Sequence, residues 1–337
     1  MSTESLTVSL VIPGRNCETT LAACLDSVLP ILQDPRSGLI EVLFVDDGST
    51  DRSAEIARAR PITYLKGEGK GPGAARNLGW RSARGELVWF IDSDTVARPD
   101  ALAILLPHLA DPKVGGVSGS YDNALPGSLL ACLIHEEIVE RHLAMKTEVD
   151  FLATFNVLYR RAILAELDGF DERYLKAQDA EFSFRVTGLG YKLHFDIASK
   201  VAHHHETSWR KYLRVQRQQG FWRVYLHLEH KGHSKGDSYS KLSDHAQPPL
   251  AMLCLASLPF GFLGIPFVPL SFFQVSSGFL FLLLLALQLP MTLRLVRRTG
   301  QQRYWLFAWM SFLRAFWRGI GMTLGVFHYW GEKEKNA

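Results

Sequence analysis

The stretch ELVWFIDSDT, Glu86 to Thr95, decides how this part of the chain folds. Five of its first six residues are apolar, which is typical of a strand buried on both faces of a sheet. The apolar run stops abruptly at Asp92-Ser93-Asp94. If the chain stays extended there, residues two apart point the same way, and both carboxylates project from one side of the sheet edge.

The Asp92/Asp94 pair allows two interpretations. Two adjacent carboxylates repel each other unless a cation lies between them. Hard oxygen ligands suit Mg²⁺ or Mn²⁺, which proteins hold through one or two carboxylates together with substrate phosphates. The alternative is a plain Asp-Ser-Asp turn that caps the next helix, since both residue types are common in turns. The neighbouring segments must decide between them.

Acidic residues or a proline also stand at the ends of other predicted strands. Strands alternate with helices within short distances, which predicts an α/β fold with a parallel, doubly wound sheet. Ligands of such sheets bind at the carboxyl ends of the strands. Pro13, Asp46-Asp47 and Asp92-Asp94 each occupy that position, so the sequence predicts one ligand site there. The other predicted strands are Leu6–Pro13 (LTVSLVIP), Glu41–Val45 (EVLFV) and Ile62–Leu65.

The segment GEGKGPGAARNLG, Gly67 to Gly79, is rich in glycine and suits the close approach of a diphosphate. It has no Gly-Lys-Ser/Thr, and Pro72 stands where a dinucleotide-binding fingerprint needs its third Gly. A flexible surface loop is the alternative. Arg76 lies in the first turn of a helix predicted for Ala74–Trp80. A lone Arg is usually a solvated charge, but beside these loops we interpret it as a phosphate or base contact.

Two polar clusters follow in the second half of this region. Asp179 lies in the first turn of a helix predicted to run from Ala177 to about Leu189. A carboxylate there suits the helix dipole, and the functional alternative is a general base facing the site. His203-His204-His205 follows a strand predicted for Tyr191–Phe195 and a short connector. This cluster is either a polar turn or a source of cation ligands that complements the Asp pair.

The composition excludes some classes of protein. The net charge is only +3, so nothing global suggests nucleic acid as a partner. The four Cys form no CxxC pair, which indicates reduced thiols in a cytosolic setting. Residues 1–13 lack a basic stretch followed by an apolar core, so we expect no signal peptide.

The carboxy-terminal part has the pattern of a membrane region. Residues 245–293 contain no Asp, Glu, Lys or Arg, a run about twice the roughly 20 residues that cross a bilayer. We predict membrane helices at about 249–271 and 277–294. A third apolar stretch, about 304–328, either spans or lies in the interface. A buried hairpin of a soluble protein is the alternative.

Basic residues near this region predict its orientation. Four arginines lie between the second and third apolar stretches, and positive loops favour the cytoplasm. Two crossings then place residues 1–245 in the cytoplasm. The helix predicted for Trp209–Glu229 mixes basic and aromatic residues; it is either a solvated helix or lies on the anionic inner leaflet. The four arginines are Arg294, Arg297, Arg298 and Arg303.

Taken together, the motifs resemble the family 2 glycosyltransferases, which are inverting enzymes with the GT-A fold. The resemblance covers about residues 6–225 and is specific because the motifs occur in the family's order. Arg15 departs from the usual aromatic residue before Asn16, and Gln178 replaces a frequent Glu. The matching segments are VSLVIPGRN (8–16), VDDGSTD (45–51), GPGAARNLG (71–79), DSD (92–94) and QDAEFSFR (178–185).

The resemblance implies a role for each of these residues. Pro13 and Asp47 would contact the nucleobase and ribose of a nucleotide-diphosphate sugar, with Asp46 supporting their loop. Arg76 would lie by the base or diphosphate. The DSD motif implies a divalent metal, Mn²⁺ or Mg²⁺: Asp94 would bind it directly, and Asp92 would meet the ribose or the metal shell. Asp179 would deprotonate the acceptor hydroxyl. His203 is the candidate for an additional ligand to the metal or the diphosphate, and His205 is the second candidate.

The resemblance also implies a membrane-anchored bacterial enzyme, similar to exopolysaccharide glycosyltransferases. Residues 1–245 would form the cytoplasmic GT-A domain, with a juxtamembrane helix and linker at 205–245, and residues 246–330 the inner-membrane region. We expect transfer of a single sugar to a lipid-linked, membrane-proximal or saccharide acceptor in polysaccharide or glycolipid synthesis. Gln218-Gln219-Gly220-Phe221-Trp222 lacks the Arg found in processive synthases. The alternatives are a processive synthase and a non-catalytic nucleotide-sugar-binding scaffold.

Overall fold

Three neighbouring strands bury both of their faces, as their continuous apolar sequences predict. They are β1 (Val8–Gly14), β2 (Leu39–Asp46) and β4 (Leu87–Ile91). Within β4, Trp89 faces one buried core and Phe90 faces the other, and β1 and β2 alternate in the same way. The computed structural model describes residues 6–230, 232, 237–263 and 270–336.

The strands form one mixed sheet in the order β3-β2-β1-β4-β8-β6-β9-β5, with β7 beside β9. The prediction of a parallel sheet holds for β1 to β4. Beyond β4 the sheet is mixed: β8 runs antiparallel to both β4 and β6 and β5 runs antiparallel to β9, whereas β6 and β9 are parallel. A buried apolar strand has the same sequence pattern in either direction, so the pattern could not reveal this. The remaining strands are β3 (Thr63–Lys66), β5 (Thr95–Ala97), β6 (Val114–Asn123), β7 (Glu148–Val149), β8 (Asn156–Arg160) and β9 (Lys192–His203).

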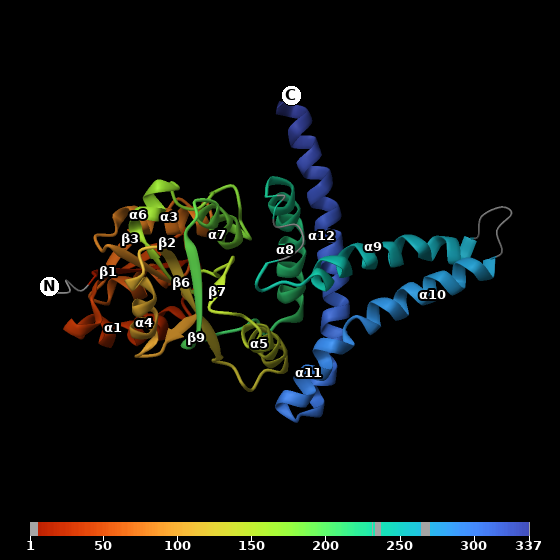
Figure 1. Ribbon diagram of the computed structural model, residues 1–337, viewed down its shortest axis with the longest axis horizontal. Helices are drawn as coiled ribbons and strands as arrows, with labels where there is room; N and C mark the ends of the chain where they lie inside the picture. The colour runs from red at the N-terminus through yellow and green to blue at the C-terminus, as the bar shows by residue number, and fades with distance from the viewer. Residues whose placement is uncertain (1–5, 231, 233–236, 264–269, 337) are drawn as a thin grey trace. The chain divides into compact units, whose positions relative to one another are not determined.

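Helices cover both faces of this sheet (Figure 1). The first core contains residues of α1, α2 and α4, and the second contains residues of α3, α6 and α7. Gly79 lets α3 lie directly on β1, because a Cβ there would collide with the side chain of Val11. The helices of this region are α1 (Leu21–Gln33), α2 (Ser53–Arg58), α3 (Pro72–Ser82), α4 (Ala101–Leu105), α5 (Leu129–His142), α6 (Arg161–Glu166) and α7 (Gln178–Gly188), with 3-10 turns η1 (Pro35–Ser37) and η2 (Leu106–Ala110).

The chain divides into two compact units, Met1–His205 and Glu206–Ala337. In the second unit α8 packs along α12, and glycines bring the two backbones close together. A Cβ at Gly220 would collide with the backbone of Arg318, and one at Gly321 with that of Arg217. The elements of this unit are α8 (Trp209–Glu229), α9 (Leu242–Leu263), α10 (Leu270–Ala286), α11 (Leu289–Thr299), η4 (Gln302–Trp305) and α12 (Leu306–Asn336).

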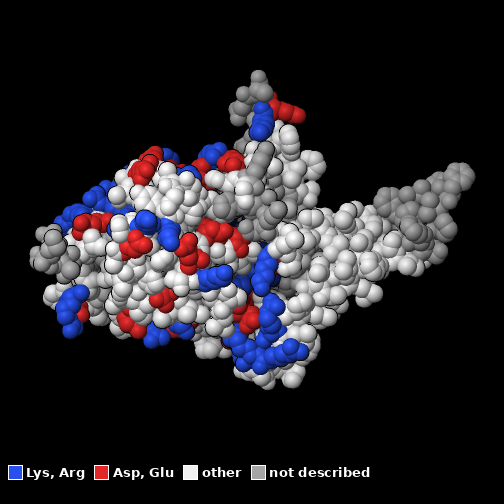
Figure 2. Space-filling view, viewed as in Figure 1, with Lys and Arg blue, Asp and Glu red and all other residues white. Residues whose placement is uncertain are grey.

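One helical run in the described part of the chain, residues 274–299, is long and apolar enough to cross a membrane. It contains the predicted span 277–294. The predicted span 249–271 extends over residues 264–269, which lie outside the described residues. The third predicted segment, 304–328, does not meet the same criterion, so the expectation of several membrane helices is not confirmed. The described parts of α10 and of α9 beyond its first turn are white in Figure 2, whereas basic side chains gather over α11.

Candidate functional site

The loop after β2 is held in shape by Asp46. This residue is buried, and its Oδ1 accepts a hydrogen bond from the Ser49 N–H at 2.8 Å. Its Oδ2 accepts a hydrogen bond from the Tyr64 hydroxyl at 2.8 Å. The Asp47 N–H donates to the Gly14 carbonyl at 2.8 Å, which ties the loop to the end of β1 beside Pro13. Asp46 therefore supports the loop and has both carboxylate oxygens occupied.

Asp47 has one carboxylate oxygen engaged and one without a partner. Its Oδ2 accepts from the Gly71 N–H at 3.0 Å, at the start of α3. Gly71 has φ 108°, a conformation that favours glycine. Asp47 Oδ1 is buried and has no hydrogen-bond partner among the described residues. A buried carboxylate oxygen in this state is suited to accept a hydrogen bond from a ligand.

Asp92-Ser93-Asp94 forms a turn between β4 and β5, so the backbone is not extended there and the condition for two parallel carboxylates is not met. The Asp92 carbonyl accepts from the Thr95 N–H at 3.1 Å and from the Thr95 hydroxyl at 2.7 Å. These two bonds close the turn. The two carboxylates consequently meet different neighbours: Arg76 contacts Asp92, and His203 contacts Asp94.

Arg76 links three elements of the first unit. Its side chain is only 5% exposed, and its Nη2 donates to Asp92 Oδ1 at 2.8 Å. In the amide orientation that satisfies its neighbours, Gln178 accepts from Arg76 Nη1 at 2.7 Å. Arg76 therefore joins α3 to the end of β4 and to the first turn of α7. Because Gln178 is neutral, it adds no second carboxylate to this contact.

Asp179 follows Gln178 in the first turn of α7. Its Oδ1 accepts from the Ala180 N–H at 2.9 Å. Burial raises the pKa of Asp179, and this outweighs the opposing effects of the Ala180 N–H and the Arg76 charge; the Asp92 charge adds to the rise. A carboxylate with a raised pKa holds a proton more strongly than an ordinary Asp. That property suits a general base.

His203 lies beside Asp94 because β9 continues further than predicted. The expected strand ended at Phe195, but β9 runs to His203, which pairs with Thr95 of β5. His203 Nε2 is 3.4 Å from Asp94 Oδ1. Asp94 Oδ1 is buried and forms no hydrogen bond with a described residue. This strand extension was not predicted, because Asp196, Ser199 and Lys200 interrupt the apolar pattern.

Asp94 and His203 affect each other's ionisation. Burial by itself would raise the pKa of Asp94, but the contact with His203 outweighs burial, and the pKa of Asp94 is lowered. Burial would likewise lower the pKa of His203, but Asp94 outweighs burial, and the pKa of His203 is raised. The two side chains thus attract each other in their charged forms.

The donor set at Asp94 fits a divalent cation. Within the described residues there is no group of three or more His, Cys, Asp or Glu side chains that could hold a metal ion. Asp94 and His203 supply two potential ligands, and Asp92 is paired with Arg76. Two protein ligands are sufficient for Mg²⁺ or Mn²⁺ when substrate phosphates complete the coordination. The orphaned Asp94 Oδ1 is consistent with such a site.

His205 follows His203 by two residues. Among the described residues it forms no hydrogen bond with Asp94. It is 3% exposed, and its two ring nitrogens lie 3.0 Å from His203 Nδ1 and 3.4 Å from His135 Nδ1. Burial lowers the pKa of His205 to about 2, so its imidazole is neutral at physiological pH. His205 is the second candidate for an additional ligand to the metal or the diphosphate; its ring nitrogens face His203 and His135, and that role stays a prediction. His135 and Tyr64 carried no sequence signal, since each lies in an ordinary helix or strand.

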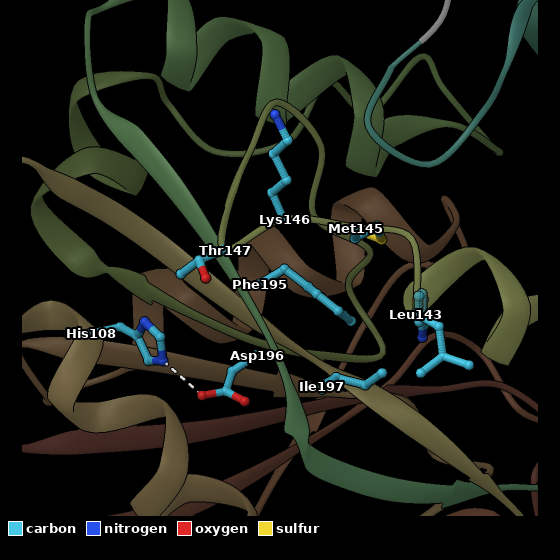
Figure 3. Close-up of a pocket in the computed structure, with 9 residues that line it drawn as sticks. His108, Leu143, Met145, Lys146, Thr147, Phe195, Asp196 and Ile197 are labelled. Carbon is cyan, nitrogen blue, oxygen red and sulfur yellow. Dashed lines mark hydrogen bonds and ion pairs between the residues drawn. The ribbon is translucent and has the colours of Figure 1, made fainter.

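A separate cavity of about 250 Å³ lies at the other end of β9 (Figure 3). Phe195, Asp196 and His108 are among its lining residues, and His108 Nε2 is 2.9 Å from Asp196 Oδ2. His108 Nδ1 is also 3.2 Å from His194 Nδ1. None of the residues that the sequence predicted for the site lines this cavity.

Known proteins resemble this chain in sequence and in fold. The model of the family "Glycosyl transferase family 2" matches residues 9–168. A probable glycosyltransferase of Bacillus subtilis, YdaM, is 28% identical over 226 residues, which are 61% of this chain and 53% of the relative. The pre-mycofactocin glycosyltransferase of Mycobacterium tuberculosis is 27% identical over 225 residues, 61% of this chain and 44% of the relative. The chain thus spans about half the length of these curated relatives.

A solved structure extends the likeness to nearly the whole chain. The mannosyltransferase PcManGT from Pyrobaculum calidifontis, in complex with GDP-Man and Mn²⁺, has a TM-score of 0.58 and 20% sequence identity. The match covers 94% of this chain and 88% of that chain. At this identity the likeness establishes a shared fold.

Proposed function

Because the model of glycosyl transferase family 2 matches residues 9–168, we propose that the protein is an inverting glycosyltransferase acting on a nucleoside-diphosphate sugar. It transfers a single sugar to a membrane-proximal or lipid-linked acceptor in polysaccharide or glycolipid synthesis. One observation carries this proposal: the Arg76–Asp92 pair acts electrostatically on Asp179, a carboxylate with a raised pKa in the first turn of α7. A nucleotide-binding scaffold without catalysis would not need that carboxylate.

The donor nucleotide binds where β1, β2 and α3 meet. Asp47 Oδ1, which lacks a hydrogen-bond partner, accepts from the nucleobase or ribose. Pro13 contacts the base, and Asp46 keeps the loop in place through Ser49 and Tyr64. Arg76 lies by the diphosphate, where a guanidinium offers several donors in a fixed geometry.

Asp94 and His203 would hold the divalent cation, with Asp92 close to its outer shell. The neighbour PcManGT was solved with GDP-Man and Mn²⁺, which supports the choice of this cation class. When bound, the cation supplies positive charge to the departing diphosphate. The Asp94–His203 contact is compatible with this role, because a carboxylate oxygen and an imidazole nitrogen are both ligands for Mn²⁺.

Asp179 acts on the acceptor. Its carboxylate takes the proton from the acceptor hydroxyl as that oxygen bonds to the anomeric carbon. The bond from the anomeric carbon to the diphosphate oxygen breaks, and the nucleoside diphosphate leaves with the electron pair. A single displacement of this kind inverts the anomeric configuration. Helix α7 and the contact between Gln178 and Arg76 hold Asp179 on the same side as the donor.

The second unit anchors the enzyme in a membrane. Residues 245–293 carry no Asp, Glu, Lys or Arg, and Val275, Phe279 and Leu282 are 72%, 62% and 68% exposed. So many exposed large apolar side chains on one helix are typical of a surface covered by lipid. Exposed Arg297 and Arg298 near the end of α11 favour the cytoplasmic side. We therefore assign the catalytic domain to the cytoplasmic face of a bacterial inner membrane.

The test is donor turnover by the detergent-purified protein, with UDP-, GDP- and TDP-sugars and with Mn²⁺, Mg²⁺ or EDTA. We expect release of one nucleoside diphosphate that depends on the cation and is lost in Asp179→Asn. Product sizing with lipid-linked acceptors separates a single addition from a ladder of products. Tight donor binding without turnover, even with membrane lipids added, would overturn the proposal in favour of a scaffold.

A further inference from the structure

Three imidazoles and a carboxylate form a continuous row that begins at Asp94. His203 Nε2 lies 3.4 Å from Asp94 Oδ1, and the other ring nitrogen, Nδ1, lies 3.0 Å from His205 Nδ1. His205 Nε2 in turn lies 3.4 Å from His135 Nδ1. The row joins the β4–β5 turn to the end of β9 and to α5. Both nitrogens of His203 and of His205 therefore face a partner.

The hydrogen atoms of such a row depend on one another. A neutral imidazole carries hydrogen on one nitrogen and a lone pair on the other. If His203 Nδ1–H donates to His205, then His205 Nε2–H donates to His135, and His203 Nε2 presents its lone pair beside Asp94. In the reverse arrangement His203 Nε2 carries a hydrogen and cannot bind a cation. The imidazoles of His205 and His135 thus decide what His203 presents to Asp94.

Ring packing also limits rotation of the row. The Tyr121 ring lies edge-on to His203, with centroids 4.9 Å apart, and edge-on to His205, with centroids 5.5 Å apart. Tyr121 is itself stacked on Phe155, with centroids 3.4 Å apart. The strand pairing of His203 with Thr95 also fixes the backbone of His203. A ring held in this way does not need to be ordered when a cation arrives, which favours binding.

We propose that His205 and His135 are positioning residues for the divalent cation: when the cation binds, they keep the Nδ1–H of His203 turned away, so that Nε2 is the nitrogen whose lone pair faces the cation beside Asp94. The inference rests on the proposed function for the identity of the cation site. It adds two residues, one just after the end of β9 and one in α5, that act on the site through His203.

The test compares two substitutions of His205 by Mn²⁺ binding. His205→Phe fills the space but offers Nδ1 of His203 no acceptor. His205→Asn returns an amide oxygen close to the position of the imidazole Nδ1. Binding of Mn²⁺ in the presence of UDP or GDP is followed by electron paramagnetic resonance, and nitrogen coupling to Mn²⁺ reports imidazole coordination. If His205 had only a structural role, its substitution would not change this nitrogen coupling.

We expect nitrogen coupling in the unsubstituted protein and its loss in His203→Gln. His205→Phe weakens Mn²⁺ affinity by about 10- to 100-fold and diminishes the coupling, as is typical when an outer partner of a metal-binding His is removed. His205→Asn restores both. His135→Leu, at a partly buried position, shifts affinity in the same direction and serves as a second test if His205→Phe does not fold.

The matched control is His194→Phe. His194 lies on β9, the strand that ends at His203, and its Nδ1 is 3.2 Å from Nδ1 of another histidine, His108, but it is at the opposite end of β9 from Asp94. It should leave Mn²⁺ affinity and nitrogen coupling unchanged. Unchanged affinity and coupling in both His205→Phe and His135→Leu would overturn the inference, as would absent coupling in the unsubstituted protein. If the spectra behave as expected but no sugar is transferred from any donor, the proposed function fails and this inference stands.

Discussion

The two carboxylates of one turn belong to different networks. Asp92 bonds to Arg76, and through it to α3 and α7. Asp94 lies beside His203, and through it connects to β9 and α5. The partner of Asp92 is a permanent cation, whereas the partner of Asp94 is an imidazole whose nitrogen can also bind a metal. Adjacent carboxylates therefore need not share a ligand.

The proposed function gives the Asp92 side and the Asp94 side different tasks. Arg76 neutralises Asp92, so that side is ready to meet a donor and to influence Asp179. Asp94 keeps an oxygen without a hydrogen bond, so that side remains available to a cation. Substitutions on the Asp94 side should change metal dependence. Substitutions on the Asp92 side should change donor affinity and the pH profile. The following predictions test that separation.

Asp94→Asn should give the largest effect. The proposed cation contributes several kcal/mol to the reaction, and about 1.4 kcal/mol corresponds to a tenfold change in rate. We expect kcat to fall by about 10⁴-fold and the difference between Mn²⁺ and EDTA to disappear, measured as nucleoside diphosphate release. Turnover that remains intact and metal-dependent would show that the cation is held elsewhere.

Asp179→Asn should lower kcat by about 10³-fold, within the range for loss of a general base. Asn has the same size as Asp but accepts no proton at neutral pH. Donor affinity should change little, because the role proposed for Asp179 is at the acceptor. Equilibrium binding of the nucleoside diphosphate provides the control. Full kcat in this variant would show that Asp179 is not the general base. The Asp92 side would then have only a role in binding.

Arg76→Lys should weaken donor affinity by about tenfold. A Lys keeps the charge but cannot contact Asp92 and Gln178 together, and a hydrogen bond to a charged group is worth about 1.5–3 kcal/mol. The measurement is the Kd of the nucleoside diphosphate with and without Mn²⁺. Because Arg76 belongs to the Asp92 side, the affinity for Mn²⁺ alone should stay the same. A parallel loss of Mn²⁺ affinity would mean that the two sides are coupled.

Gln178→Glu should give the smallest effect, on the pH profile. An Asp base works only when ionised, so activity falls as pH decreases through its pKa; because the pKa of Asp179 is raised, this fall should occur above the usual range for Asp. A carboxylate at position 178 would disfavour ionisation of Asp179 further. We expect the acid limb of kcat/KM to move to higher pH by less than about one unit. A shift to lower pH would contradict the electrostatic role of this side.

The sequence determined the strands and the residues at their ends. Leu87 to Ile91 is a buried strand, and its alternating side chains face two cores. Asp46 ends β2 and Asp47 follows it, so both lie at the predicted strand end, and the helix expected for Trp209–Glu229 coincides with α8. These features were predictable because apolar residues repeat with the period of the element that buries them.

The contacts between distant segments were decided only by the tertiary structure. The sequence could not give the antiparallel direction of β8, the extension of β9 to His203, or the separation of Asp92 from Asp94. A periodic pattern specifies which side chains face the core, but it does not specify the direction of a strand or its neighbours. The direction of β8 follows from its pairing with β4 and β6. The contact between Asp94 and His203 follows from the register of β5 on β9 and from the closure of the Asp92–Thr95 turn. The sequence thus determined which residues lie at the edge of the sheet, and the packing of distant segments determined which of them meet.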